Sequence, residues 1–120
     1  MPSGKTSLST PKVVENLIGA LDSKIFKALS EPVRADILKY LLLNGRSDIA
    51  TIAENLPQDR SVISRHLSIL ADAGILKAAK ETRHVFYDIN GTAFLNYFEE
   101  IVDNLKKFMS QCCMNESDTR

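Results

Sequence analysis

The sequence predicts a mainly α (α+β) fold, in which several helices accompany one two-stranded hairpin. Three observations predict this class. Apolar residues recur at spacings of three and four over most of the chain, which is the period of an amphipathic helix. Gly74 ends a helical segment that is polar at its start and apolar along one face. The segments Ile75–Ala79 and His84–Ile89 then have the composition of two short strands joined by a charged turn.

Length and composition set the class of protein before any motif is considered. The chain has 120 residues and a hydrophobic fraction of 44%, which is typical of a single globular domain. No apolar run approaches the roughly 20 residues that span a bilayer. Residues 1–11 are polar and do not resemble a signal peptide. We therefore expect a cytoplasmic protein without a membrane partner, made of an arm (1–11), a folded domain (12–111) and a tail (112–120).

The first two helices are predicted from apolar spacing and from prolines. The first covers about 12–29, with Pro11 near its start, where a missing N–H costs little. Its apolar stripe contains Val14, Leu17, Ile18, Leu21, Ile25 and Leu29. Pro32 opens the second helix, which ends at Asn44–Gly45. The apolar positions of that helix are Val33, Ile37, Leu38, Leu41 and Leu42.

The middle of the chain predicts a helix-turn-helix. Ser47–Asp48 should cap a short helix through Leu56, and Pro57–Gln58 turns the chain into a helix from Asp59 to Ala73. The hairpin that follows would be a wing. A polar-fronted helix followed by a basic hairpin suits DNA, because the helix enters the major groove and the hairpin reaches the flanking backbone. We therefore predict a winged helix-turn-helix with a two-stranded wing.

The charge distribution agrees with this placement. The formal net charge is zero, which by itself argues mildly against nucleic-acid binding. Residues 57–87, however, contain five bases and three acids, a local charge of +2 before either histidine is counted. Residues 91–120 contain three bases and five acids, a charge of −2. Positive charge thus gathers in the segment predicted to contact DNA.

The side chains predicted to contact DNA lie at the start of the 59–73 helix and on the wing. They are Gln58, Arg60, Ser61, Ser64, Arg65, His66, Arg83 and His84. The short serines allow the backbone to approach the groove, and the longer side chains can reach base edges or phosphates. The alternatives are a solvated helix start capped by Asp59 and a merely exposed hairpin. For His66 the alternative is packing against the preceding helix, with its ring nitrogens hydrogen-bonded.

The last helix, from about Thr92 to Ser110 or beyond, predicts a homodimer. Its apolar residues are spaced four, three, four and three: Phe94, Phe98, Ile101, Leu105 and Phe108. This is the narrow seam of a helix that packs on another helix. The first helix has a similar stripe that includes Leu17 and Leu21. We predict dimerisation through these terminal helices; the alternative is that both helices pack on their own core.

In these features the chain resembles the ArsR/SmtB family of bacterial winged-helix repressors over about residues 24–108. The matching segments are Phe26–Arg34, Ile37–Leu41, Ser61–Leu67 and Ala73–Leu76, together with Leu70, Arg83 and Tyr87. The resemblance implies a dimer that binds inverted-repeat operators in double-stranded DNA. It also implies release from DNA by a metal, a metalloid or a small molecule.

The wing turn departs from the family's frequent Glu-Gly-Arg. Here it is Glu81-Thr82-Arg83. Losing glycine removes the residue that most easily adopts positive φ, so the tightest hairpin turns become less favourable. We therefore expect the wing to end in a looser loop.

The chain contains two cysteines, Cys112 and Cys113, which are adjacent. A disulfide between them is disfavoured by geometry and by a cytoplasmic location. Paired thiolates suit a soft ion, and arsenic-responsive members of the family with cysteines late in the last helix look similar. We predict a trivalent arsenical, either arsenite or an organoarsenical, as the inducer, with no cofactor required. The alternatives are another soft metal, reversible thiol oxidation and two inert cysteines.

Other chemistry lacks the residues that it needs. The two histidines lie in the predicted DNA-contacting segment, and there is no glycine-rich phosphate loop or C-x-x-C motif, so an enzyme is not expected. The family's other metal sites would need cysteine or histidine in 46–56 or histidine in 92–111, and neither segment contains them. Glu99, Glu100 and Asp103 are expected to form a solvated face, with Asp103 paired to Lys106 or Lys107.

Together these features predict a homodimeric DNA-binding transcriptional repressor that leaves its operator when a soft metalloid binds Cys112 and Cys113. A thiol-redox-responsive repressor of the same fold is the first alternative. A winged-helix module used for protein–protein contact is a more remote one.

Overall fold

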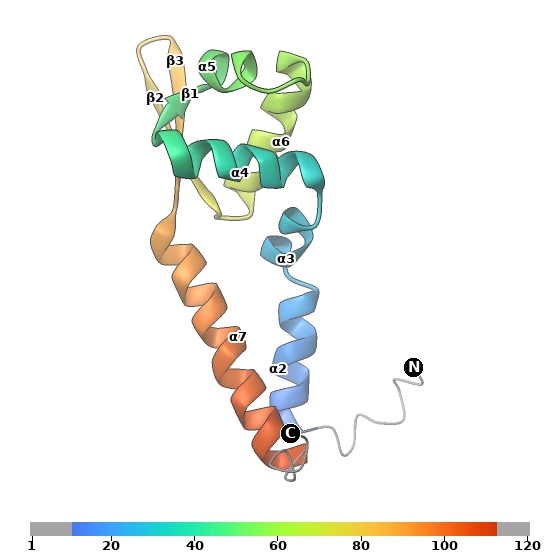
Figure 1. Ribbon diagram of the computed structural model, residues 1–120. Coiled ribbons are helices and arrows are strands. Elements are labelled where there is room, and N and C mark those ends of the chain that lie inside the picture. Colours follow the sequence, from blue (N-terminus) through green and yellow to red (C-terminus); the bar gives the residue numbers. More distant parts are fainter. Residues whose placement is uncertain (1–10, 113–120) are drawn as a thin grey trace. The chain divides into compact units, whose positions relative to one another are not determined.

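The computed structural model describes residues 11–112 of the chain (Figure 1). The elements are, in order, α2 (Lys12–Leu21), α3 (Lys24–Leu29), α4 (Pro32–Asn44), β1 (Ser47–Asp48), α5 (Ile49–Glu54), α6 (Arg60–Asp72), β2 (Leu76–Glu81), β3 (His84–Ile89) and α7 (Gly91–Cys112). They form two compact units. The winged unit is Lys24–Leu95, and the terminal unit combines the described residues 11–23 and 96–112. Within 11–112, no helix is long and apolar enough to cross a membrane.

The single helix predicted over 12–29 is wrong, because the chain forms two helices there. α2 ends at Leu21, and α3 starts at Lys24. At the break, the Ser23 hydroxyl donates to the Ala20 carbonyl at 2.7 Å. Short polar side chains such as Asp22 and Ser23 compete with the helix for backbone hydrogen bonds. The apolar period runs across the break, so the period alone did not reveal it.

One apolar core holds the winged unit together. Its fully buried side chains come from α4, α5, α6 and the residue just before β2: Ile37, Leu41, Ile52, Ile63, Leu67, Leu70 and Ile75. α4 begins as predicted at Pro32, with the Glu31 carboxylate accepting from the Val33 N–H at 3.3 Å. Leu42, grouped with the apolar positions of α4 in the sequence, is 72% exposed, because it follows buried Leu41 by a single residue and turns away from the core.

The sheet has three antiparallel strands in the order β1–β3–β2. β2 and β3 pair along their whole length, from Leu76↔Ile89 to Glu81↔His84. β1 pairs with the far edge of β3, through Ser47↔Tyr87 and Asp48↔Phe86. The sequence predicted the hairpin but only a capping role for Ser47–Asp48. A strand of two residues is too short to show the alternation by which strands are recognised.

The wing turn is tighter than the sequence predicted. Glu81 and His84 are paired, so Thr82 and Arg83 alone connect the two strands. The expectation of a looser loop is therefore wrong. Thr82 itself adopts the left-handed conformation, with φ 56°. This conformation costs a β-branched residue roughly 1–3 kcal/mol, and the pairing on both sides of the turn imposes it.

The helices on either side of the hairpin have clear boundaries. Gly74 ends α6 with φ 86°, and the Ile75 N–H donates back to the Leu70 carbonyl at 3.0 Å. α7 begins behind Asn90, whose side-chain oxygen accepts from the Ala93 N–H at 3.3 Å. The end of α6 agrees with the boundary predicted from Gly74, and α7 begins one residue before the predicted start at about Thr92.

In the terminal unit, α2 lies against one face of α7. The Asn16 side chain donates to the Asn104 side-chain oxygen at 3.1 Å, and the Tyr97 hydroxyl donates to the Ala20 carbonyl at 3.3 Å. Val13 and Asn104 are buried. Asn104 is polar but satisfied, because its amide also donates to the Glu100 carbonyl.

Candidate nucleic-acid interface

The helix α6 separates its core face from a polar face. Ile63, Leu67 and Leu70 are buried, and their spacing of four and three places them on one side. Arg60 and Arg65 are exposed. Ser61 is also exposed and Ser64 is half-buried, so the short side chains lie between the two arginines in the sequence. The polar face that the sequence predicted is therefore exposed to solvent and accessible to DNA.

Gln58 is half-buried, just before α6. Its side-chain oxygen is buried and has no hydrogen-bond partner among the described residues. Leaving such an oxygen unpaired costs about 1–3 kcal/mol. In this conformation Gln58 presents that oxygen to the protein interior, and reading a base edge with it would require a change of rotamer.

His66 packs toward α4. The Arg34 Nε–H donates to His66 Nδ1 at 3.1 Å, and another Arg34 nitrogen donates to the Ala28 carbonyl at 3.3 Å. Because Nδ1 accepts a hydrogen bond, the ring is neutral and carries its proton on Nε2. Burial lowers the pKa of His66, and the charges of Arg34 and Arg65 lower it further against the opposing effect of Glu31. This geometry corresponds to the packed alternative for His66.

The wing presents Arg83 at its tip and His84 beside it. Both residues are exposed. His84 Nδ1 lies 3.2 Å from the Asp48 carboxylate, which also accepts the Thr51 N–H at 3.0 Å and so caps α5. Hydrogen bonds from Thr51 lower the pKa of Asp48, and the charges of His84 and Arg60 add to this effect against partial burial. Asp48 thus lies within electrostatic reach of both the wing and the start of α6.

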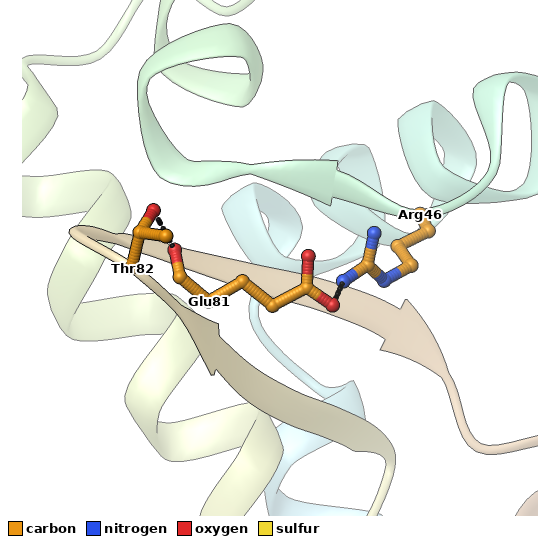
Figure 2. A network of polar contacts seen from close by, with 3 residues as sticks. All are labelled: Arg46, Glu81 and Thr82. Carbon is orange, nitrogen blue, oxygen red and sulfur yellow. Dashed lines mark hydrogen bonds and ion pairs between the residues drawn. The ribbon is translucent and has the colours of Figure 1, made fainter.

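Arg46 belongs to the same surface, although the sequence analysis did not single it out. Its guanidinium forms an ion pair with Glu81 across 2.5 Å, and it lies over the Phe86 ring at 4.1 Å from the centroid. Figure 2 shows Arg46 meeting the carboxylate of Glu81, the residue that precedes Thr82 in the wing. Arg46 and Glu81 are 35 residues apart, and no local pattern signals their contact. The pairing of β1 with β3 brings them together.

The helix α7 carries two apolar stripes rather than one. The first contacts the chain's own residues: Phe94 packs on the core of the winged unit, and Tyr97 and Asn104 bond to α2. The second stripe is 42–57% exposed and is spaced three, four, three and four: Leu95, Phe98, Val102, Leu105 and Met109. We call this second set the exposed stripe.

The predicted seam residues divide between the two stripes. Phe98 and Leu105 belong to the exposed stripe, and Leu21 of α2 is 57% exposed. Leu17, Phe94, Ile101 and Phe108 are half-buried within the chain.

The two cysteines lie at the end of the described chain. Cys112 is the last residue of α7, and Cys113 lies outside the described residues. Among residues 11–112 there is no cluster of three or more histidine, cysteine, aspartate or glutamate side chains that could hold a metal ion. The expected pairing of Asp103 is confirmed, since Lys107 Nζ lies 3.5 Å from its carboxylate.

A helix-turn-helix with an exposed polar recognition helix, followed by a hairpin that carries cations, defines a winged-helix DNA-binding regulator. Comparison with known proteins identifies its family. Residues 31–78 match the family described as "Bacterial regulatory protein, arsR family".

Three curated relatives carry related descriptions. An uncharacterized HTH-type transcriptional regulator of Methanocaldococcus jannaschii is 45% identical over 67 residues, which cover 56% of this chain and 75% of the relative. A cadmium resistance transcriptional regulatory protein CadC homolog of Staphylococcus aureus is 34% identical, covering 57% of this chain and 56% of the relative. The arsenical resistance operon repressor of Bacillus subtilis is 28% identical, covering 73% and 86%.

Among solved structures, an ArsR-like transcriptional regulator from Rhodococcus sp. RHA1 has the same fold. Its TM-score is 0.68 at 21% identity, covering 89% of this chain and 95% of that one. The chain therefore belongs to the ArsR family of helix-turn-helix regulators. It is a transcriptional repressor whose partner is DNA, and not an enzyme.

Proposed function

We propose that this chain is a homodimeric repressor that binds an inverted-repeat operator and is released by a trivalent arsenical at Cys112 and Cys113. The observation that carries the DNA-binding part is the open polar face of α6 beside a wing tipped by Arg83. Arg60 and Arg65 can reach base edges in the major groove, where arginine pairs bidentately with guanine. Arg83 suits the phosphate backbone, whose contacts set the position of the protein on DNA.

The exposed stripe of α7 supports a dimer. Its five large apolar side chains have coiled-coil spacing, and each is about half exposed in a single chain. Exposure of a contiguous apolar row to water is unfavourable, and such a row is typical of an interaction surface. A second copy is the natural partner, because a two-fold interface brings the same surface of each protomer together. A two-fold dimer also matches an inverted-repeat operator. Relative to the predicted seam, the proposed contact shifts by one residue, with Leu95, Val102 and Met109 in place of Phe94, Ile101 and Phe108.

The cysteine pair supports a soft-ion inducer. Cys112 is the last residue of α7, three residues after Met109 in the sequence. A ligand at Cys112 would therefore act at the end of the proposed dimer helix. Thiolates favour soft ions, and the names of two relatives refer to arsenical and cadmium resistance. Release requires that the ligand bind the DNA-free geometry more tightly than the DNA-bound geometry.

The test follows the fraction of DNA bound, using an operator selected from a pool of random duplexes. The parent and a Cys112→Ser/Cys113→Ser variant are titrated with arsenite, a monosubstituted trivalent organoarsenical, Cd²⁺ and peroxide. We expect both proteins to bind DNA equally and only the parent to respond to arsenicals. The organoarsenical should act at least as well as arsenite, because it needs only two thiolates.

Two outcomes would contradict the inducer. Identical release curves for the parent and the double variant would place the inducer site elsewhere. Release of the parent by peroxide but by no arsenical would favour the redox-responsive alternative. Failure of both proteins to select any DNA sequence would instead overturn the operator part of the proposal.

A further inference from the structure

The strand register gathers charged and aromatic side chains on the outer face of the wing sheet. Side chains alternate between the two faces of a strand. Ser47 and Tyr87 are paired and buried, at 8% and 6% exposure, so they face the core. Their neighbours therefore face outward: Arg46, Asp48 and Phe86 directly, and Glu81 and His84 through the pairing of β2 with β3. These five residues form what we call the wing clamp.

The wing clamp holds both sides of the hairpin turn. Arg46 forms an ion pair with Glu81, the residue before the turn (Figure 2). The Arg46 guanidinium also lies over the Phe86 ring. Asp48 forms the matching contact with His84, the residue after the turn, at 3.2 Å. Both holding residues come from the short segment around β1, and Asp48 is itself fixed as the cap of α5. The turn between the two contacts consists of Thr82 and Arg83.

We propose that Arg46 is a positioning residue for DNA binding: through Glu81 it fixes the wing turn so that Arg83 is already placed to meet a phosphate. This inference rests on the proposed contact of Arg83 with DNA. Ion pairs this exposed add little to folding stability. Their effect should instead appear in binding, because a side chain ordered in advance need not lose its freedom when the complex forms.

A direct contact between Arg46 and a phosphate is the competing explanation. The two explanations predict opposite effects of Glu81→Gln on operator affinity. If Arg46 acts by positioning, then Glu81→Gln should weaken operator binding, because it removes the partner of Arg46. If Arg46 binds a phosphate itself, then Glu81→Gln should strengthen binding, since it frees the arginine and removes a negative charge near DNA. The two explanations also differ in salt dependence. Each lost phosphate contact lowers the slope of log affinity against log salt concentration by about one, so Arg46→Gln should lower that slope only if Arg46 binds a phosphate itself.

The experiment measures operator affinity against salt concentration for Arg46→Gln, Glu81→Gln and the charge swap Arg46→Glu/Glu81→Arg. We expect each single variant to bind about two- to tenfold more weakly, the factor for ordering one additional side chain on binding. The salt slope should be unchanged, and the swap should recover most of the loss. In an Arg83→Ala background, Arg46→Gln should have little further effect. The thermal unfolding midpoint reports on folding separately and should be unchanged.

Lys39→Gln provides a matched control, since Lys39 is an exposed residue of α4 that pairs with Asp36 at 3.8 Å, outside the wing clamp. Stronger binding by Glu81→Gln, or an equal effect of Arg46→Gln with and without Arg83, would overturn the positioning role. Wild-type binding by Arg46→Gln would overturn it as well. In all three cases a weakened Arg65→Ala variant would show that the proposed DNA interface still stands. If Arg65→Ala also binds like the parent, the proposed interface itself fails.

Discussion

At the residue scale, the pair formed by His66 and Arg34 shows how one contact sets a protonation state. Arg34 is always a donor, so a ring nitrogen that faces it must be the acceptor. The neutral form of His66 is therefore built into the contact between α6 and α4. The sequence left two roles open for His66, since nothing local indicates that Arg34, 32 residues earlier, lies beside it.

This pair predicts a pH dependence of stability. Burial and Arg34 lower the pKa of His66 from its ordinary value of 6.5, so below that value the unfolded chain binds more protons than the folded chain. The contribution of His66 to the free energy of unfolding is complete above about pH 6.5, and it is lost as the pH falls through the pKa of His66 in the folded chain. We expect the free energy of unfolding, measured with urea, to fall as the pH drops from about 7.5 to 5.

His66→Gln is the control for that prediction, because glutamine can accept from Arg34 but does not titrate. The variant should lose less stability than the parent over the same range. His84, the other histidine, is present in both proteins and cancels in the comparison. If the parent lost no more stability than His66→Gln between about pH 7.5 and 5, the assignment would be contradicted. The lowered pKa of Asp48 acts only in a more acidic window, below its ordinary value of 3.8.

At the scale of elements, α6 and the wing should contribute to DNA binding in different ways. A side chain in the major groove reads sequence, whereas a side chain on the backbone contributes equally to every sequence. The buried residues of α6 hold the helix to the core, so exposed Arg65 can be changed without disturbing the packing. Arg83 at the wing tip can likewise be changed without affecting the core.

We therefore predict different signatures for Arg65→Ala and Arg83→Ala. Arg65→Ala should weaken operator binding by about 1–3 kcal/mol and relax the preference at one base position. Arg83→Ala should weaken binding to all sequences alike. It should also lower the slope of log affinity against log salt concentration by about one, as expected for one lost phosphate contact. Affinities for the operator and for single-base variants, measured at several salt concentrations, separate the two. Lys39→Ala, at an exposed position of α4, should behave like the parent. Wild-type binding by both arginine variants would refute this interface.

At the scale of the whole molecule, assembly is predicted to depend on the exposed stripe. Val102→Glu places a charge in the middle of that stripe, where burial without a partner is costly. We expect a folded protein that sediments as a monomer and binds the operator weakly, since one protomer reaches only one half-site. Ser110→Glu adds the same charge at an exposed α7 position outside the stripe and should remain dimeric. A dimeric Val102→Glu variant would show that a different surface joins the protomers.

Most of the winged unit could be predicted from the sequence, because its signals are local. Pro32 and Gly74 mark helix ends by their own backbone chemistry, and both predictions agree with the structure. The apolar period identified α6 and its polar start, and therefore the class of protein. The resemblance to the ArsR family in these segments is confirmed by the match over residues 31–78.

The remaining features depended on contacts between distant residues. The turn at Thr82 is tight because paired strands on both sides impose it, against the local preference of threonine. The strand β1 exists only because β3 lies beside it, and Arg46 reaches Glu81 for the same reason. The spacing of α7 likewise shows that it is amphipathic but not which stripe its own chain covers. Local backbone preference and apolar period are properties of a segment, whereas register and burial depend on neighbours that only the folded chain provides.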